Sequence, residues 1–533
     1  MKKITLLIAS LLLFGSSAFA ANLYLIANNA STWTSTPTGF DNVYKVDLSN
    51  SGTNGTTTVS LTQWLNDRNA AAPTYLINGV AGVTFATTDQ VWVAGGTYNI
   101  AIAWTVLSAA GTPTPGNIYG GFVGTENTVN ERAKGASAWN FTNETIINSS
   151  TSTTGAIAAG GDRTITFDGI TFNGFGTTQA FQQRGNMNIQ NCKFTSNTAA
   201  AIVFYNGTKN TSVTNSYFYN NSYPTGSNAA CINLNTSTAT VVYTVSGCVF
   251  ESNSNASTSS GTSAGIKTQG SGTYNISNCI FKNNKATGGS SSAVSFTVAT
   301  SNMTNCLVYG NVADAGTLPG LYMTAGTVTN CSFLNTFKGT YINSNAATTL
   351  TNCVFWGTLT ASGQINTGGT TANITLNNCA YISTGTVNAN NSGIVLPATN
   401  TTGTNAPNFT DPDNNIWTLA AGSSLLDMGT STNAPATDLL GTSRPQGSGI
   451  DIGAYERTVT TGIADVKQVN CKVINGCLMI DQLEKNTHVN VYSVTGKNIY
   501  STISADNTIS IPLSNGIYIV NANNINTKVV VNK

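Results

Sequence analysis

Short runs of alternating apolar and polar residues fill the middle of this chain, and clusters of Gly, Asn and Ser separate them. Many of these runs begin with an Asn-Cys step, with an aromatic or aliphatic residue two places after the Cys. The Cys position of successive copies is occupied by Ile170, Cys192, Ser216, Cys248, Cys279, Cys306, Cys331, Cys353 and Cys379. Neighbouring copies are 22 to 32 residues apart, a spacing typical of one turn of a solenoid.

The composition of each copy predicts that this solenoid is built from strands. Val, Ile, Thr, Phe and Tyr fill the runs, and a second short apolar run precedes most steps, as in residues 200–204 and 293–296. Such alternation, bounded by turn residues, is typical of strands, and no copy has helical spacing. We therefore predict a right-handed parallel β-helix, in which equivalent positions of successive turns stack about 4.8 Å apart.

The Cys and the residue two places later lie on the same side of a strand, which we expect to face the inside of the β-helix. Buried cysteines ordinarily act as small hydrophobes; metal binding or redox chemistry is the alternative. No Cys-x-x-Cys pair occurs, and neighbouring cysteines are a whole turn apart. We therefore predict buried, stacked and reduced thiols at Cys192, Cys248, Cys279, Cys306, Cys331, Cys353 and Cys379. The preceding Asn is expected at a left-handed bend, where side-chain amides can hydrogen-bond along the stack.

The beginning of the chain has the features of a secretory signal peptide over residues 1–20. Lys2 and Lys3 precede an apolar core at 4–14, and Ala18-Phe19-Ala20 form a cleavage site with small residues at its first and third positions. No other segment is apolar over the length that spans a bilayer. We therefore expect a secreted protein without a membrane span.

The remaining chain is expected to have three parts. Residues 21–160 should form an N-terminal cap with the first turns, including a short helix at 61–67. Residues 161–457 should form the body of the β-helix with its closing cap, because a solenoid needs atypical end units that block edge pairing. In residues 461–533 the Asn-Cys repeat stops, and strand-like runs recur around the hairpin signal at 475–476. We predict a small Ig-like β-sandwich there, and hence an all-β protein.

Composition excludes several classes of function. Charged residues make up only 8% of the chain and the net charge is +1, so nothing favours attraction to nucleic acid. His488 is the only histidine and lies in the predicted sandwich. A His-dependent triad or His-based metal site is therefore excluded from the β-helix, and we predict neither a metal nor another cofactor.

Four features of the chain resemble bacterial secreted right-handed β-helix repeat proteins. They are the strand ending Ala-Gly-Gly-Thr-Tyr at 94–98, the Tyr-Gly-Gly-Phe segment from 119, the Asn-Cys turns, and Asp-Ile-Gly-Ala-Tyr-Glu at 451–456. The resemblance covers about residues 85–457. It implies that the last motif closes the β-helix. It leaves the activity open, because such proteins include adhesins, other surface proteins and polysaccharide-active enzymes.

The C-terminal segment resembles the sorting domain of type IX secretion substrates. Three motifs carry the resemblance in the expected order, and they contain Gly496, Lys497, Gly516, Tyr518 and Lys528. The resemblance implies a Gram-negative cell, the type IX secretion machinery as partner, and a location on the outer-membrane surface or outside the cell. An ordinary adhesive Ig-like module is the alternative.

Catalytic side chains are scarce in the repeat region. Between residues 169 and 410 the only carboxylates are Glu251 and Asp314, and the only arginine is Arg184. Glycosidases need two carboxylates flanking the scissile bond, and pectate-type lyases need carboxylate-bound Ca²⁺ and a base. The candidates for an acid–base patch are Asp162, Arg163, Asp168 and Arg184; salt bridges and turn caps are the structural alternative.

Two further clusters are interpreted as structural. Residues 411–415 vaguely resemble a Ca²⁺ loop, but a Pro-containing turn of the last coil fits them better. Around Arg444, a charge network in the closing cap is expected with Asp427, Asp438, Asp451 and Glu456.

Aromatic residues supply the other candidate site. Tyr217, Tyr219, Tyr309 and Trp356 lie at positions of alternating or neighbouring parity to the inward columns, and those that face outward could stack on sugar rings. We therefore predict a non-enzymatic adhesin or scaffold of the cell surface that contacts polysaccharide or host glycans. A polysaccharide lyase or glycoside hydrolase of the β-helix type is the alternative.

Overall fold

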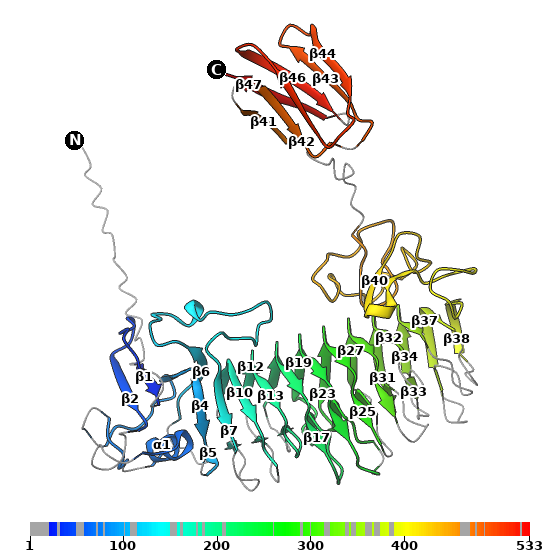
Figure 1. Cartoon of the computed structure of the whole chain (residues 1–533). Coiled ribbons are helices and arrows are strands. Elements are labelled where there is room, and N and C mark those ends of the chain that lie inside the picture. The colour runs from blue at the N-terminus through cyan, green and yellow to red at the C-terminus, as the bar shows by residue number, and fades with distance from the viewer. Residues whose placement is uncertain are drawn as a thin grey trace, which may run out of the picture. The chain divides into compact units, whose positions relative to one another are not determined.

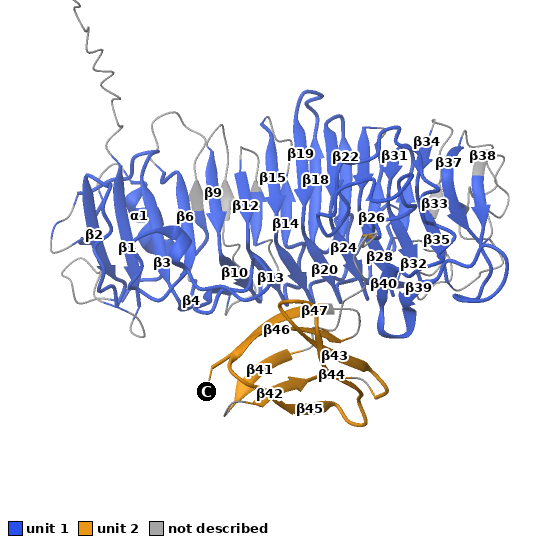
Figure 2. Cartoon of the chain, turned by 90° about the horizontal axis from the view of Figure 1, so that it is seen from above, with its two compact units in different colours: residues 1–457 blue, residues 458–533 orange. Residues whose placement is uncertain are grey.

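In the computed structural model, the chain divides into two compact units, residues 1–457 (unit 1) and 458–533 (unit 2) (Figure 2). The structure describes residues 21–532 except for 29–31, 50–57, 71–72, 78–79, 81, 101, 107–113, 150–156, 160–163, 177–179, 184–186, 205–208, 260, 288–290, 299, 314–319, 336–339, 343–347, 358–364, 367–373, 383–388, 459–469, 475–476, 484 and 523–524. Unit 1 is a parallel β-helix and unit 2 is an Ig-like sandwich, so the predicted all-β fold is confirmed.

The β-helix has three parallel sheets, and successive turns lie side by side along it (Figure 1). Sheet 1 contains β2 (Asn42–Asp47), β1 (Asn22–Ala27), β3 (Gln90–Ala94), β6 (Asn117–Phe122), β9 (Ile165–Asp168), β12 (Met187–Gln190), β15 (Thr211–Thr214), β19 (Val242–Ser246), β23 (Thr273–Ser277), β27 (Ser301–Thr304), β31 (Gly326–Thr329), β34 (Thr348–Thr351), β37 (Ile374–Tyr381) and β38 (Ala389–Val395). Sheet 2 contains β4 (Gly96–Asn99), β7 (Thr145–Asn148), β10 (Ile170–Asn173), β13 (Lys193–Thr195), β16 (Tyr217–Tyr219), β20 (Val249–Glu251), β24 (Ile280–Lys282), β28 (Leu307–Tyr309), β32 (Ser332–Leu334), β35 (Val354–Trp356) and the end of β37.

Sheet 3 closes the third side of each turn. It contains β5 (Trp104–Val106), β8 (Ile157–Ala159), β11 (Phe181–Gln183), β14 (Ile202–Phe204), β18 (Ile232–Thr236), β22 (Ile266–Gly270), β26 (Val294–Phe296), β30 (Leu321–Met323), β33 (Thr340–Ile342) and β36 (Ile365–Asn366). A short fourth ladder runs through β17 (Ser222–Tyr223), β21 (Ser254–Asn255), β25 (Lys285–Ala286) and β29 (Val312–Ala313). Near the N-terminus, α1 (Leu61–Arg68) begins with a capping box at Ser60, which confirms the predicted helix.

The inward columns follow the repeat. Phe218, Phe250 and Phe281 are in register on neighbouring strands, and their rings stack with centroids 4.8 and 4.6 Å apart. All ten cysteines are free, and the seven of the repeat step are buried as predicted. Their thiols donate weak hydrogen bonds to main-chain carbonyls, as Cys279 does to Ser277 at 3.1 Å. Burial raises the pKa of the Cys192 thiol to about 12, which keeps it protonated and unreactive.

The asparagine that opens most copies of the repeat step is left-handed, as predicted. At Asn191, Asn215, Asn278, Asn305, Asn330, Asn352 and Asn378 φ lies between 48° and 54°. This residue turns the chain from sheet 1 into sheet 2, and Asn tolerates that conformation better than other residues with a Cβ. Amide-to-amide bonds join only part of this column, for example Asn352 to Asn330 at 3.1 Å. We call these residues the outer Asn column.

A second asparagine column, which the sequence analysis missed, lies at the far end of sheet 2. It consists of the fully buried Asn197, Asn221, Asn253, Asn284 and Asn311. In the last four members, the side-chain Oδ1 accepts both the main-chain N–H and the Nδ2 of the preceding member, at 2.8–3.1 Å. Each Nδ2 also donates to a main-chain carbonyl of the preceding turn. We call this the inner Asn ladder.

Unit 2 has two antiparallel sheets around its own core. The first contains β41 (Asn470–Ile474), β42 (Cys477–Asp481) and β45 (Thr508–Pro512). The second contains β44 (Asn498–Ile503), β43 (His488–Ser493), β46 (Gly516–Ala522) and β47 (Ile525–Val531). Leu478, Val491 and Val520 pack between the two sheets. Among the described residues of both units, no helix is long and apolar enough to cross a membrane.

Candidate functional site

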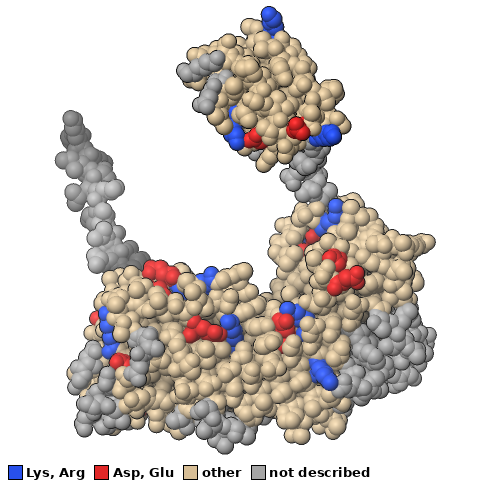
Figure 3. Space-filling model, in the orientation of Figure 1, with Lys and Arg blue, Asp and Glu red and all other residues tan. Residues whose placement is uncertain are grey.

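Over β13, β16, β20 and β24, the outer face of sheet 2 carries two rows of exposed or half-buried side chains. The middle residue of each three-residue strand points into the core, so the first and third residues point outward. Over β16, β20, β24 and β28 these rows form the floor of a groove of about 560 Å³. The groove is lined by Ser137, Trp139, Asn140, Tyr217, Val249, Glu251, Ile280, Lys282, Leu307, Tyr309, Asn415 and Tyr455. Figure 3 shows this face hollowed between two raised segments, with basic and acidic atoms adjoining in the hollow.

Residues 123–143, which we call the N-terminal wall, bound the groove on one side. The wall contains η1 (Val129–Glu131), and its Trp139 stacks on Tyr217 with ring centroids 5.5 Å apart and planes at 14°. Buried Arg132 anchors it by donating to the Gly120 carbonyl at 2.9 Å, by pairing with Asp168 at 3.1 Å and by stacking over Phe141. These contacts fix Trp139 over the strands of sheet 2.

The Tyr-Gly-Gly-Phe segment of the sequence explains how the wall reaches the β-helix so closely. Gly121 has φ of 89°, and a Cβ there would lie 2.5 Å from the Phe141 ring. A side chain at this position would therefore push Phe141 and the wall outward. The role of the segment is to seat the N-terminal wall on sheets 1 and 2.

Residues 396–457, which we call the closing cap, bound the other side of the groove. The cap contains the hairpin of β39 (Phe409–Asp411) and β40 (Ile416–Leu419) with η2 (Pro412–Asn414) between them. Its buried Trp417, Leu425 and Ile452 pack on outward side chains of sheet 2, including Leu307 and Val354. The cap thereby covers the outer face of sheet 2 over the later turns. It also brings Asn415 and Tyr455 to the groove.

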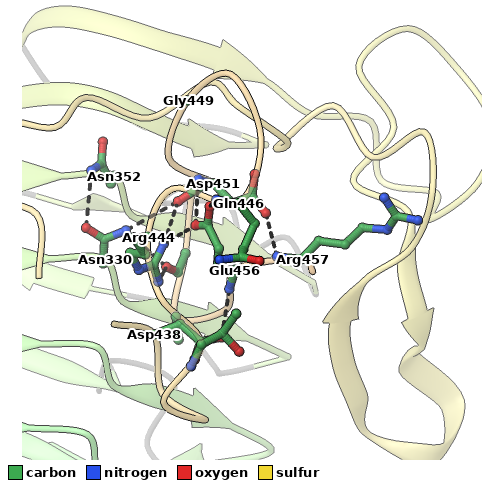
Figure 4. A network of polar contacts seen from close by, with 12 residues as sticks. Asn330, Asn352, Asp438, Arg444, Gln446, Gly449, Asp451, Glu456 and Arg457 are labelled. Carbon is green, nitrogen blue, oxygen red and sulfur yellow. Dashed lines mark hydrogen bonds and ion pairs between the residues drawn. The ribbon is translucent and has the colours of Figure 1, made fainter. Parts of the chain in front are cut away.

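The closing motif forms the buried network drawn in Figure 4. Arg444 pairs with Glu456 at 2.9 Å and donates to the carbonyls of Asp451 and Gly453. Asp438 accepts the main-chain N–H of Glu456 at 2.9 Å. Burial raises the pKa of Asp451 to about 6, although both its oxygens accept main-chain N–H groups.

Asp427 belongs to the same region but accepts from the Gly449 N–H at 2.9 Å. The expected charge network is therefore present, with main-chain groups as most of the partners of its carboxylates. This network joins the segment that contains Arg444 to the segment that contains Glu456, beneath the surface of the cap.

A carboxylate joined to two side chains lies on the groove floor. Glu251 Oε2 accepts from the Tyr217 hydroxyl at 2.8 Å and from Lys282 Nζ at 2.9 Å. No described residue donates to Oε1 of Glu251, and the side chain retains 23% of its exposure. Burial, followed by the bond to Glu251, raises the pKa of Tyr217, and burial raises that of Tyr309. Both phenols therefore stay protonated at neutral pH and can donate hydrogen bonds.

The closing cap leaves three of the four predicted aromatic residues accessible and covers the fourth. Tyr217 and Tyr309 line the groove, and Tyr219 is 42% exposed and stacks on Tyr217. Trp356 also points outward from sheet 2, but the cap leaves it only 8% exposed, and its indole N–H donates to the Pro397 carbonyl. Trp356 therefore offers no ring face to a ligand.

The predicted acid–base patch is described only at Asp168. That carboxylate is buried, and Arg132, Gln190 and Asn191 donate to it, which fits the structural alternative. Asp162, Arg163 and Arg184 lie outside the described residues.

Residues 411–415 form the Pro-containing turn, with Asp411 capping η2 through the Asn414 N–H. The turn belongs to the cap hairpin and not to the last coil of the β-helix, which corrects its predicted place. Among the described residues, no three His, Cys, Asp or Glu side chains gather as a metal site.

The residues of the proposed sorting motifs lie at turns and on strands of unit 2. Gly496 has φ of 83° in the turn between β43 and β44, next to the exposed Lys497. Gly516 begins β46, and buried Tyr518 donates to the Ser514 carbonyl at 3.0 Å. Lys528 is exposed on β47. Their placement shows that Gly496 serves a tight turn and Tyr518 the core.

Of the lining residues, the sequence analysis named only Tyr217 and Tyr309 as binding candidates, and it missed Trp139, Lys282 and Tyr455 among the others. Only Tyr455 carried a usable signal, because it stands in the closing motif. Compared with known proteins, the chain matches no family model and no curated protein sequence.

Proposed function

We propose that this chain is a carbohydrate-binding protein of the cell surface and that the groove on sheet 2 holds the glycan. The observation that carries the proposal is the gathering of Trp139, Tyr217, Tyr309 and Tyr455 around one groove. Ligand sites combine apolar and aromatic walls with a few placed polar groups. Sugar rings offer apolar C–H faces to aromatic rings and hydroxyl edges to groups such as Glu251 and Asn415.

The inventory of the groove supports binding more than cleavage. Glu251 is the one carboxylate among the described lining residues, and it is paired with Lys282. Hydrolysis of a glycosidic bond ordinarily uses two carboxylates, and the Ca²⁺-dependent elimination needs a carboxylate cluster for the ion. The alternative function as a lyase or glycoside hydrolase therefore has less support.

Replacing Trp139 with Ala should weaken glycan binding by the mature chain by about tenfold or more, because an aromatic wall of the groove is lost. A glycan array should first identify the ligand, and calorimetry should then compare the variants. The ligand should be recovered intact after incubation. Tyr500→Ala is the matched control, since Tyr500 is 37% exposed in unit 2. Equal binding by Trp139→Ala and the native chain, or a cleaved ligand, would contradict the proposal.

Unit 2 is proposed to be the type IX sorting domain that exports unit 1 across the outer membrane. The sandwich fold and the three sequence motifs support this role. The described core of each unit contains no residue of the other, so unit 1 should fold without unit 2.

Deleting residues 461–533 should therefore leave a folded β-helix in the periplasm of a cell that has the secretion system. Surface labelling and fractionation would locate the truncated chain, and circular dichroism of the recovered protein would test its fold. The control is the full chain expressed in the same strain. Normal surface display of the truncated protein would rule out the sorting role.

A further inference from the structure

We infer that the groove selects neutral glycans over those bearing carboxylate groups, and that Glu251 determines this selectivity. The inference deepens the proposed function and rests on it. It names the chemical class of the ligand from the charges that the groove presents.

The charged groups that face the groove cancel each other. Glu251 and Lys282 are its charged lining residues, and their side chains are 2.9 Å apart. On the neighbouring turns toward the N-terminal wall, Lys193 is likewise paired with Glu144 at 3.1 Å and donates to Asn140. The two lysines on this part of sheet 2 are thus already neutralised by carboxylates of the protein.

An acidic glycan would have to compete with Glu251 for Lys282. Its carboxylate would enter a part-buried site beside a carboxylate of the protein, and like charges repel more strongly where water is partly excluded. Placing like charges side by side in this way lowers the affinity for an acidic glycan and so makes the groove selective for a neutral one. No cation among the described lining residues is free to compensate.

A neutral glycan meets complementary groups in the same place. Glu251 lines the groove, and its Oε2 is held by Tyr217 and Lys282, whereas no described residue donates to its Oε1. The carboxylate is therefore fixed in position and can accept from a sugar hydroxyl. Hydrogen bonds to an ionised acceptor are stronger than those between neutral groups, so this contact should carry much of the polar recognition.

The test compares hexasaccharides of equal length by calorimetry. The neutral series contains gluco-, manno- and xylo-hexaose, and the acidic series contains hexagalacturonate and a hexameric guluronate. The native mature chain should bind its best neutral ligand at least about tenfold more tightly than either acidic one. Glu251→Gln should lower neutral affinity about tenfold and raise acidic affinity by a similar factor, because Lys282 then becomes an unpaired cation.

The double variant Glu251→Gln with Lys282→Met separates charge from shape. It removes both charges, so the gain in acidic affinity seen in the single variant should disappear. Native preference for acidic ligands, or an unchanged ratio of affinities in Glu251→Gln, would overturn the inference while Trp139-dependent binding still supported the proposed function. If no hexasaccharide bound, or if binding survived Trp139→Ala, both would fail.

Discussion

Replacing Asn253 with Leu should lower the free energy of unfolding of unit 1 by about 5 kcal/mol, because it breaks the inner Asn ladder at its middle member. The side chain donates to the Phe218 carbonyl and to Asn284, and it accepts two bonds from Asn221. Leucine leaves these buried groups without partners, and each costs about 1–3 kcal/mol. Urea unfolding of residues 21–457, followed by fluorescence and circular dichroism, would measure the loss.

Asn275→Leu is the matched control for the ladder. Asn275 lies on the outer side of sheet 1, where its Oδ1 accepts from Asn302 at 3.0 Å and water can replace the bond. The change there should stay within about 1 kcal/mol. Losses of equal size at both positions would show that burial of the ladder does not matter to stability.

Replacing Arg444 with Met should release the closing cap from sheet 2 and cost about 3–5 kcal/mol, because Glu456 is left as a buried carboxylate without its cation. Glu456 is only 5% exposed. The apolar side chains packed between the cap and sheet 2, such as Trp417 of the cap and Val354 of the sheet, should then become accessible. Faster proteolysis within residues 396–457 and stronger binding of a hydrophobic dye would report the release.

Arg457→Met is the control for the cap. Arg457 contacts Asp451 through its main-chain N–H, and its side chain points away from the network in Figure 4. This change should alter stability by less than about 0.5 kcal/mol. If the cap resists proteolysis equally well in Arg444→Met and in Arg457→Met, the anchoring role of Arg444 is contradicted.

The sequence was sufficient for the fold because most turns between residues 169 and 381 repeat the same local pattern. A left-handed Asn, an inward Cys and an inward aromatic residue recur at fixed offsets, and stacking makes each copy support the next. The inner Asn ladder was missed for a physical reason. Asparagine is usually exposed, so a polar residue three places after the inward Phe gave no sign of burial, and only its partners in neighbouring turns satisfy it.

The groove could be predicted only in part, because its walls come from distant segments. Tyr217 and Tyr309 were identified from strand parity, which is a local property. Trp139 and Tyr455 lie on either side of the repeat region in sequence, and only the tertiary fold brings them to the same four strands. Trp356 shows the limit of parity, since it points outward as expected for its place in the strand but lies beneath the closing cap.

The outer Asn column bends the chain in each turn, and it also fixes the number of turns between the two walls of the groove. Asn305, Asn352 and Asn378 donate their side-chain amides to main-chain carbonyls of the closing cap, whereas Asn191 is joined to the Arg132–Asp168 pair beneath the N-terminal wall. The two walls are thus pinned to counted turns of one helix. Duplicating or deleting a turn between them would change the distance from wall to wall in steps of about 4.8 Å. The length of ligand that such a protein accommodates can therefore change by whole repeats, with neither wall altered.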